Sequence, residues 1–198
     1  MIPIRDAIRS KNFPIVNVII IGLNIIVFLW QLAQGPHLKE SLYLYGIVPL
    51  RYSNPELSVH FTMLQQYLPF LTSMFLHGGF LHIIMNMWFL YIFGDNIEDR
   101  LGHIRYFIFY LLCGAVATGT HIIANPESTV PSIGASGAIA GILGAYIMLY
   151  PRARVAVLLP IFVFIQVIRL PAVLVLGFWF VEQIFNGALA ITGNAYSS

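Results

Sequence analysis

Residues 75–94 read FLHGGFLHIIMNMWFLYIFG, a run that contains no Asp, Glu, Lys or Arg. A helix needs about 20 mostly apolar residues to cross the hydrocarbon core of a bilayer, so this run predicts a membrane-spanning helix. It also contains His77, His82 and Asn86. Polar side chains at that depth are costly in lipid and usually face the interior of a helix bundle. We therefore expect these three residues to form part of a buried polar site.

The composition of the whole chain supports a membrane protein. Apolar residues make up 59% of the 198 residues and charged residues only 9%. A soluble domain carries about 25% charged residues, and a disordered chain is poor in apolar residues, so both classes are excluded. The net charge of +2 is too small and too dispersed for a nucleic-acid-binding surface. The lone Cys113 excludes an intramolecular disulfide and a cysteine-based zinc site.

Other charge-free stretches predict further spanning helices. No stretch shows the alternating pattern of a membrane β-barrel strand, and inside lipid only helices or closed barrels satisfy the backbone. The sequence therefore predicts an all-α, polytopic bundle in which residues 1–198 form a single membrane domain. Residues 155–169 are apolar but short, and we expect an interfacial or partly inserted piece there. In residues 34–74 we expect short elements on the membrane surface. The five predicted spans are 14–33, 75–94, 105–124, 135–150 and 171–190.

The basic residues predict the orientation. Most of the ten Lys and Arg residues lie in alternate connections, and basic residues concentrate on the cytoplasmic side of membrane proteins. The amino terminus is therefore expected in the cytoplasm, and the segment 34–74, which holds Lys39 and Arg51, outside. The residues on the predicted cytoplasmic side are Arg5, Arg9, Lys11, Arg100, Arg105, Arg152, Arg154 and Arg169.

A serine completes the predicted polar site. Ser136 begins the span 135–150, which enters from the outer side, so its depth matches that of His82. A helix amino terminus offers unpaired N–H groups and a partial positive charge. Acyl transfer needs a nucleophile and hydrogen-bond donors for the oxyanion. The hydroxyl of Ser136 suits the first role, and His82 and Asn86 suit the second. His77, nearer the surface, is expected to face the substrate side or the interface. An alternative interpretation is purely structural. Ser136 would then cap the helix, and His82 and Asn86 would form hydrogen bonds between helices.

Two further patterns predict helix contacts. Gly137, Gly141 and Ala145 recur every four residues, and such a stripe of small residues lets another helix approach closely. We expect that helix to be the span 75–94. In the first span, Asn17 and Asn24 are expected to link neighbouring helices by hydrogen bonds.

Three motifs in this order resemble those of the rhomboid family of intramembrane serine proteases. The first is H-x4-H-x3-N, carried by His77, His82 and Asn86, and the second is E-x-R, carried by Glu98 and Arg100. The third is G-x-S-G at residues 134–137. Their order, spacing and predicted depth agree with the family, and the resemblance extends over about residues 14–190.

The resemblance implies a fold of six helices, of which five are present, and a serine endopeptidase. It makes Ser136 the nucleophile, and His82 and Asn86 the oxyanion donors, while Glu98 and Arg100 would brace the cytoplasmic loop. Substrates would be transmembrane segments of other proteins, cut near the extracytoplasmic face, and no metal, nucleotide or other cofactor is needed. A lateral gate would lie around residues 178–180.

One part of the family pattern is missing. The general base of the family is a histidine on the sixth helix, which this sequence does not contain. We therefore expect either the amino-terminal part of a longer enzyme or an inactive, truncated relative. Two other functions stay open: a non-catalytic protein that binds transmembrane helices, and a small transporter with a polar relay of His82 and Asn86. The protein is expected in a prokaryotic inner membrane, and the sequence leaves its oligomeric state open.

Overall fold

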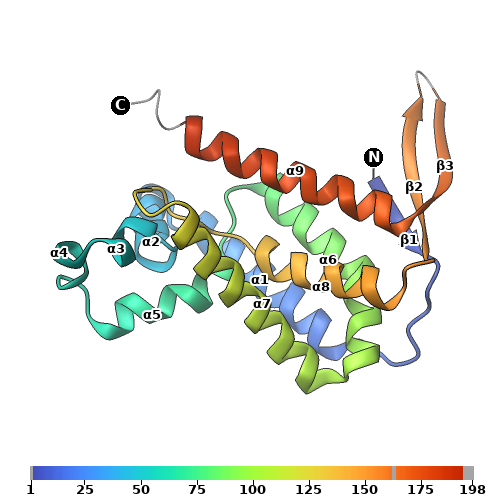
Figure 1. Cartoon of the computed structure of the whole chain (residues 1–198), viewed down its shortest axis with the longest axis horizontal. Helices are drawn as coiled ribbons and strands as arrows, with labels where there is room; N and C mark the ends of the chain where they lie inside the picture. The colour runs from blue at the N-terminus through green and yellow to red at the C-terminus, as the bar shows by residue number, and fades with distance from the viewer. Residues whose placement is uncertain (1, 162–163, 194–198) are drawn as a thin grey trace.

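A computed structural model describes the backbone of residues 2–161 and 164–193 (Figure 1). Five long helices cover the ranges predicted to span the membrane, which confirms the helical bundle. They are α1 (Ile15–Ala33), α6 (Phe80–Leu101), α7 (His103–Ala124), α8 (Ser136–Leu149) and α9 (Ala172–Gly193). The largest difference from the prediction is in α6, which begins at Phe80 rather than at residue 75 and continues to Leu101.

The number of membrane spans stays a prediction. By length and composition, α1 and α7 can each cross a bilayer. Helix α6 qualifies together with residues 63–75, from which it is bent by 77°. Helix α8 and the part of α9 from Ala172 to Gln183 are apolar but shorter.

Short helices form the segment between α1 and α6, as expected for residues 34–74. They are α2 (Leu38–Tyr45), α3 (Pro49–Ser53), α4 (Pro55–Ser58) and α5 (Met63–Thr72), with 3₁₀ turns at Gly35–His37 and Ser73–Phe75. Thr62 begins α5 with a capping box, because its side chain accepts from the Gln65 N–H and the Gln65 side chain accepts from the Thr62 N–H.

The segment 155–169 contains strands, which the all-α prediction did not include, whereas its expected interfacial or partly inserted position stays a prediction. This segment forms an antiparallel hairpin of β2 (Arg154–Ile161) and β3 (Phe164–Pro171), and β1 (Ile2–Asp6) pairs with β2 to give the order β1-β2-β3. The hairpin projects from one end of the helical bundle (Figure 1). The segment is rich in β-branched residues, which favour strands, and Val155 and Val157 are fully buried on one face of the sheet. The bundle is therefore helical in its spans but not throughout the chain.

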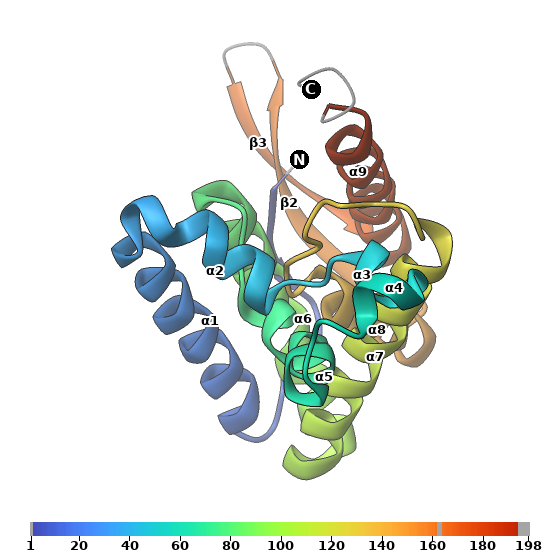
Figure 2. The same ribbon diagram turned by 90° about the vertical axis from the view of Figure 1, so that its left-hand side faces the viewer.

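Helix α6 lies at the centre of the bundle, with α1 on one side and α7 and α8 on the other (Figure 2). Its side chains Leu90, Phe93 and Ile97 are fully buried. The ring of Phe93 packs edge-to-face on that of Tyr146 in α8, with centroids 5.0 Å apart. The second half of α6 and the later part of α8 thus share an apolar core.

The stripe of small residues on α8 faces a different helix from the one predicted. A Cβ added to Gly137 would lie 2.6 Å from the Cβ of Ala117, and one added to Gly141 would overlap the side chain of Cys113. Ala117 and Cys113 both lie on α7. The stripe therefore gives α8 its close contact with α7, and α6 packs on another face of α8.

Polar contacts near the start of α1 join this helix to its neighbours. The side-chain amide of Asn17 donates to the carbonyl of Leu90 at 3.0 Å and accepts from the hydroxyl of Tyr106 at 2.7 Å, which links α1 to α6 and α7. Asn24, by contrast, donates to the Ile20 carbonyl of its own helix. The prediction of interhelical bonds is thus confirmed for Asn17, whereas the bond of Asn24 lies within α1.

The carboxylate of Glu98 accepts hydrogen bonds from the first turn of α1. It is 1% exposed and accepts from the N–H groups of Val16 at 2.9 Å and Asn17 at 2.7 Å. These are N–H groups in the first turn of α1, where no carbonyl of the helix can accept them. Glu98 also contacts the imidazole of His103. Arg100 is exposed, and within the described part of the chain its side chain has no hydrogen bond.

Candidate active site

Ser136 is the first residue of α8, and the segment before it is fixed at two points. Ser132 and Ile47 exchange backbone hydrogen bonds of 2.7 and 3.1 Å, and the Gly134 N–H donates to the carbonyl of Ser73 at 2.8 Å. Gly134 has a φ of +127°, a conformation that glycine adopts most readily because it lacks a Cβ. The segment before the serine thus forms a turn that places Ser136 at the start of α8, close to the first turn of α6.

His82 lies in the first turn of α6 and is half-buried. Its Nδ1 accepts from the Gly78 N–H at 3.3 Å, so a neutral ring carries its proton on Nε2. The edge with Cε1 and Nε2 faces Gly134, since a Cβ built on that glycine would be 2.9 Å from both atoms. The imidazole therefore directs an N–H donor, not a free lone pair, toward the turn that precedes Ser136.

Gly134 lies between the imidazole and the hydroxyl. The same Cβ position is 3.8 Å from the Oγ of Ser136. The hydroxyl is half-buried and has no hydrogen-bond partner among the residues that the structure describes. The structure thus brings Ser136 and His82 to one place and leaves the hydroxyl free.

Asn86 follows His82 by one turn on the same face of α6. It is 1% exposed, and neither its amide nitrogen nor its amide oxygen finds a partner among the described atoms. A buried polar group without a partner typically costs about 1–3 kcal/mol and calls for an explanation. Among the described residues no hydrogen bond joins Asn86 to Ser136, so the structure aligns Asn86 with His82 but not directly with the hydroxyl.

His77 is more buried than expected. Its side chain is 2% exposed, and its ring packs edge-to-face on that of His82, with the centroids 5.1 Å apart. It therefore packs against the His82 ring inside the protein, while its position near the membrane surface stays a prediction. Its Nε2 has no partner within the described residues.

Gln31 is the site-supporting residue that sequence reasoning missed. Its side-chain amide donates to the His77 carbonyl at 3.0 Å and accepts from the His77 N–H at 2.9 Å. A signal for it was present, because Asn17, Asn24 and Gln31 recur every seven residues, so they lie along one face of α1. All three are at most 2% exposed.

The chemistry of these groups suits acyl transfer. The site holds a free hydroxyl at a helix amino terminus, an imidazole donor beside it and an unpaired carboxamide one turn further. In the described parts of the chain, no group of three or more His, Cys, Asp or Glu residues could hold a metal ion.

Residues 64–195 of the chain match the family model described as "Rhomboid domain". The chain is 31% identical to "Rhomboid protein 1, mitochondrial" of Saccharomyces cerevisiae over 142 residues, which are 69% of this chain and 37% of that protein. It is 32% identical to the human "Presenilin-associated rhomboid-like protein, mitochondrial" over 149 residues, which are 73% of this chain and 36% of that protein.

A third relative is "RHOMBOID-like protein 6, mitochondrial" of Arabidopsis thaliana, 39% identical over 75 residues. That match covers 38% of this chain and 24% of the relative. The chain therefore matches between about a quarter and somewhat more than a third of the length of these relatives. No solved structure matches it significantly.

Proposed function

The chain belongs to the rhomboid family, and from this premise we propose that it is an intramembrane serine endopeptidase that cleaves transmembrane segments of other proteins near the extracytoplasmic face. It is an integral membrane protein. The observation that carries the proposal is the convergence of the Ser136 hydroxyl and the Nε2 edge of His82 on Gly134. No other described serine pairs a free hydroxyl at a long helix start with such a donor.

In the proposed reaction the Oγ of Ser136 attacks the scissile carbonyl carbon, and negative charge develops on the carbonyl oxygen. The N–H groups of the first turn of α8 and the Nε2–H of His82 would stabilise that charge, because donors fixed in advance act where charge appears. The neutral tautomer set by the Gly78 N–H supports this role for His82. A ring that already carries a proton on Nε2 is unsuited to accept one from the hydroxyl.

The proton of the hydroxyl needs another acceptor. By resemblance to the family, this is a histidine on a sixth helix, which the present sequence does not include. The whole reaction is therefore proposed for the protein that contains that helix. This chain would supply the nucleophile and the oxyanion donors.

Asn86 is proposed as a further donor to the oxyanion or to the substrate backbone. Its amide is buried and unpaired, and a substrate carbonyl would provide the missing acceptor. The interaction would form only when substrate is bound, which accounts for a polar group kept without a partner.

The substrate must present an accessible peptide carbonyl, which an intact helix does not. Transmembrane segments with glycine or other poor helix formers near the outer face would unwind at the lowest cost. Lipid-embedded proteins are accordingly the proposed partners. The matched relatives are named as mitochondrial proteins, so the prokaryotic inner membrane stays a prediction for this chain.

Replacing Ser136 by alanine tests the proposal. The full-length protein in proteoliposomes would be assayed with a fluorogenic transmembrane substrate and labelled with a serine-reactive phosphonate. Ser136→Ala should abolish both cleavage and labelling. Ser132→Ala is the matched control, because the contacts of that serine are made by its backbone, and it should retain both activities. Undiminished cleavage by Ser136→Ala would overturn the assignment.

A non-catalytic protein that binds transmembrane helices is the second candidate. It is favoured by one observation: the Ser136 hydroxyl has no base bonded to it in the described part of the site. Such a protein would retain transmembrane segments on co-purification, in wild type and Ser136→Ala alike, and would not react with the phosphonate.

A further inference from the structure

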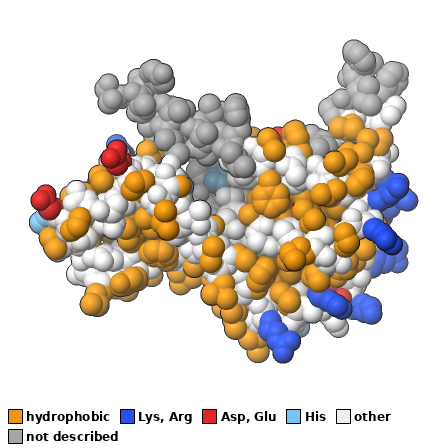
Figure 3. All heavy atoms as spheres, in the orientation of Figure 1, with side chains coloured by type: hydrophobic (Ala, Val, Ile, Leu, Met, Phe, Trp, Pro, Cys, Tyr) orange, Lys and Arg blue, Asp and Glu red, His pale blue; other side chains and the backbone are white. Residues whose placement is uncertain are grey.

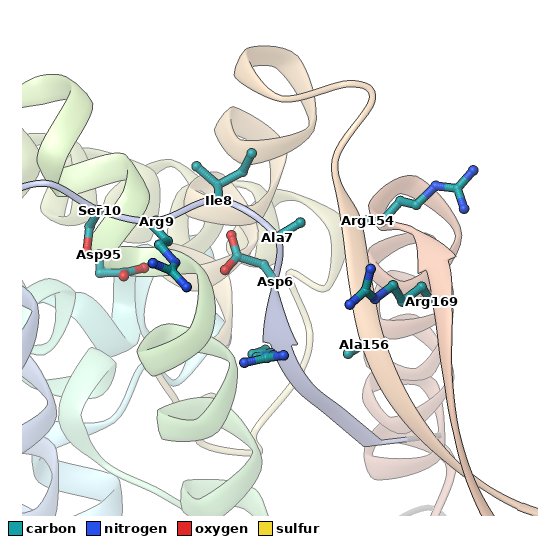
Figure 4. A pocket seen from close by; sticks show the side chains of 10 residues that line it. Asp6, Ala7, Ile8, Arg9, Ser10, Asp95, Arg154, Ala156 and Arg169 are labelled. Carbon is teal, nitrogen blue, oxygen red and sulfur yellow. The ribbon is translucent and has the colours of Figure 1, made fainter.

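A cavity lies at the opposite end of the bundle from Ser136, where the sheet meets the helices. Its volume is about 560 Å³, within the usual range of ligand pockets. It is lined by β1, the segment after it, β2, β3 and the end of α6 (Figure 4). Its charged lining residues are Arg5, Asp6, Arg9, Asp95, Arg154 and Arg169.

The register of the sheet places arginines along one face. Arg5 pairs with Ala156, and Ala156 pairs with Arg169, so these three side chains project from the same side of the sheet. Arg154 precedes Ala156 by two residues and shares that side. The small side chain of Ala156 leaves a gap between Arg5 and Arg169, whose backbones are two strand spacings apart, roughly 10 Å.

A fourth arginine closes the arrangement from the helical side. Figure 4 shows Arg9 and Arg169 reaching into the pocket from opposite sides, with Asp6 between them, whereas the end of Arg154 points outward. Among the described residues, no carboxylate lies within 4.0 Å of any of the four guanidinium groups. The pocket thus holds several cations without their own counter-ions.

The two carboxylates of the pocket are engaged elsewhere. Asp6 accepts from the hydroxyl of Tyr146 at 2.6 Å and from the side-chain amide of Asn96 at 3.0 Å. Burial raises the pKa of Asp6 to about 6, which weakens its charge as a counter-ion. Asp95 accepts from both the backbone and the side-chain nitrogen of Asn96. Both carboxylates therefore serve bonds within the protein.

The surroundings of the pocket are those of a membrane surface. Lys and Arg side chains gather at this end of the molecule, beside a broad area of hydrophobic side chains (Figure 3). Ile2, Phe13 and Val167, from the elements around the pocket, are each more than half exposed. Basic residues at this end are also those that the positive-inside rule assigns to the cytoplasmic leaflet. An occupant would meet guanidinium groups and apolar surface together.

We propose that this pocket binds the phosphate headgroup of an anionic phospholipid from the cytoplasmic leaflet. Guanidinium groups bind phosphate oxygens in pairs of parallel hydrogen bonds, and basic pockets at the ends of membrane helices suit lipid headgroups. The acyl chains would lie on the exposed apolar side chains, which a free phosphate ion would leave unused. The site does not depend on the proposed protease reaction.

Lipid titration of the delipidated full-length protein, followed by native mass spectrometry, tests the proposal. Phosphatidylglycerol should bind at least about tenfold more tightly than phosphatidylcholine. The variant R9Q/R169Q should lose about tenfold in affinity for phosphatidylglycerol. The matched control R100Q/R105Q removes the same charge from exposed residues outside the pocket and should lose less than twofold.

Three results would overturn the proposal. Equal losses in the two double variants would mean that only diffuse positive charge attracts the lipid, and no loss in either would exclude the pocket. Displacement of bound phosphatidylglycerol by micromolar inorganic phosphate would assign the pocket to a free anion. The single variant R169Q changes an exposed position of the outer strand β3 and should lose less affinity for phosphatidylglycerol than the double variant. Its thermal unfolding would verify that it folds.

Discussion

The side-chain amide of Gln31 bonds both backbone polar groups of His77, accepting from its N–H at 2.9 Å and donating to its carbonyl at 3.0 Å. One side chain of α1 thereby fixes the chain just before α6 begins. The ring of His77 in turn packs on that of His82. The position of the proposed oxyanion donor thus depends on a residue of the first helix.

Removing this amide should weaken both stability and activity. Gln31→Ala would leave a buried N–H and a buried carbonyl without partners, at a cost of roughly 1–3 kcal/mol. We expect a lower unfolding temperature in detergent and a reduced kcat, because His82 would lose its support. Gln34→Ala is the control, since Gln34 bonds only to neighbours outside the site. An unchanged kcat for Gln31→Ala would show that His82 keeps its place without the bond.

Adding one methyl group between the two proposed catalytic residues should impair catalysis. In Gly134→Ala the new Cβ would lie 2.9 Å from Cε1 and Nε2 of His82, and alanine is strained at a φ of +127°. A displacement of about 1 Å in a reacting group can cost 10²-fold, so kcat should fall by about that factor. Gly144→Ala, where a Cβ meets nothing within 4 Å, should leave activity unchanged.

The two proposed donors should act mainly on turnover. His82→Ala and Asn86→Ala should each lower kcat by roughly 10²–10³-fold with little change in KM, because an oxyanion donor binds the transition state more strongly than the substrate. Steady-state kinetics on a transmembrane substrate would measure both constants. His60→Ala, at an exposed position, is the control and should leave both constants unchanged. A rise in KM with constant kcat would instead assign these residues to substrate binding.

Glu98 should matter for stability and little for chemistry. Glu98→Gln replaces a buried carboxylate that accepts two N–H groups at the start of α1. Hydrogen bonds to a charged group contribute about 1.5–3 kcal/mol, so the variant should unfold at a lower temperature. Glu56→Gln, at an exposed position, should not. Equal unfolding temperatures for Glu98→Gln and wild type would contradict the bracing role.

Asp6 should make stability depend on pH. Burial raises its pKa from 3.8 to about 6, so the folded state holds the proton more tightly than the unfolded state does. Its contribution to stability is therefore full below about pH 4 and is lost as the pH rises through about 6. Asp6→Asn should flatten this slope in unfolding temperatures measured from pH 4 to 7. Glu40→Gln, at an exposed position, should leave the slope in place.

Much of the bundle could be predicted because lipid imposes simple rules. Runs without charge located all five long helices, and the matching depths of His82 and Ser136 indicated that these two residues would lie near each other. The physical signal is strong here, since an unpaired charge in lipid is expensive and a helix alone satisfies its backbone.

The sheet could not be predicted in the same way. The strand β1 pairs with residues 155–158, far along the chain, and pairing over such distances leaves no local pattern. On β2 the side chains of both faces are mostly apolar. No polar residue separates Val155 from Val157, so the alternation of polar and apolar residues that marks a strand is absent. The prediction from sequence assigned the four pocket arginines a role only in the orientation of the protein in the membrane. Their convergence depends on the register of the sheet, which becomes visible only in three dimensions.

The partner of the small-residue stripe was missed for a related reason. Gly137 and Gly141 indicate close packing but not which helix approaches, and α7 and α6 both offer compatible surfaces. Gln31 was not predicted, because a single glutamine near the end of an apolar span carries little signal by itself. Its spacing from Asn17 and Asn24 shows that it belongs to one buried polar face of α1.

Tyr146 lies on the same helix as Ser136, roughly 15 Å further along its axis, and its hydroxyl bonds Asp6. The indole of Trp88 also donates to the Pro3 carbonyl at 2.6 Å. An affinity tag or fluorescent fusion placed directly ahead of Ile2 would therefore adjoin the strand that secures the helix presenting the serine. Measurements of turnover are best made on a protein whose label is attached elsewhere.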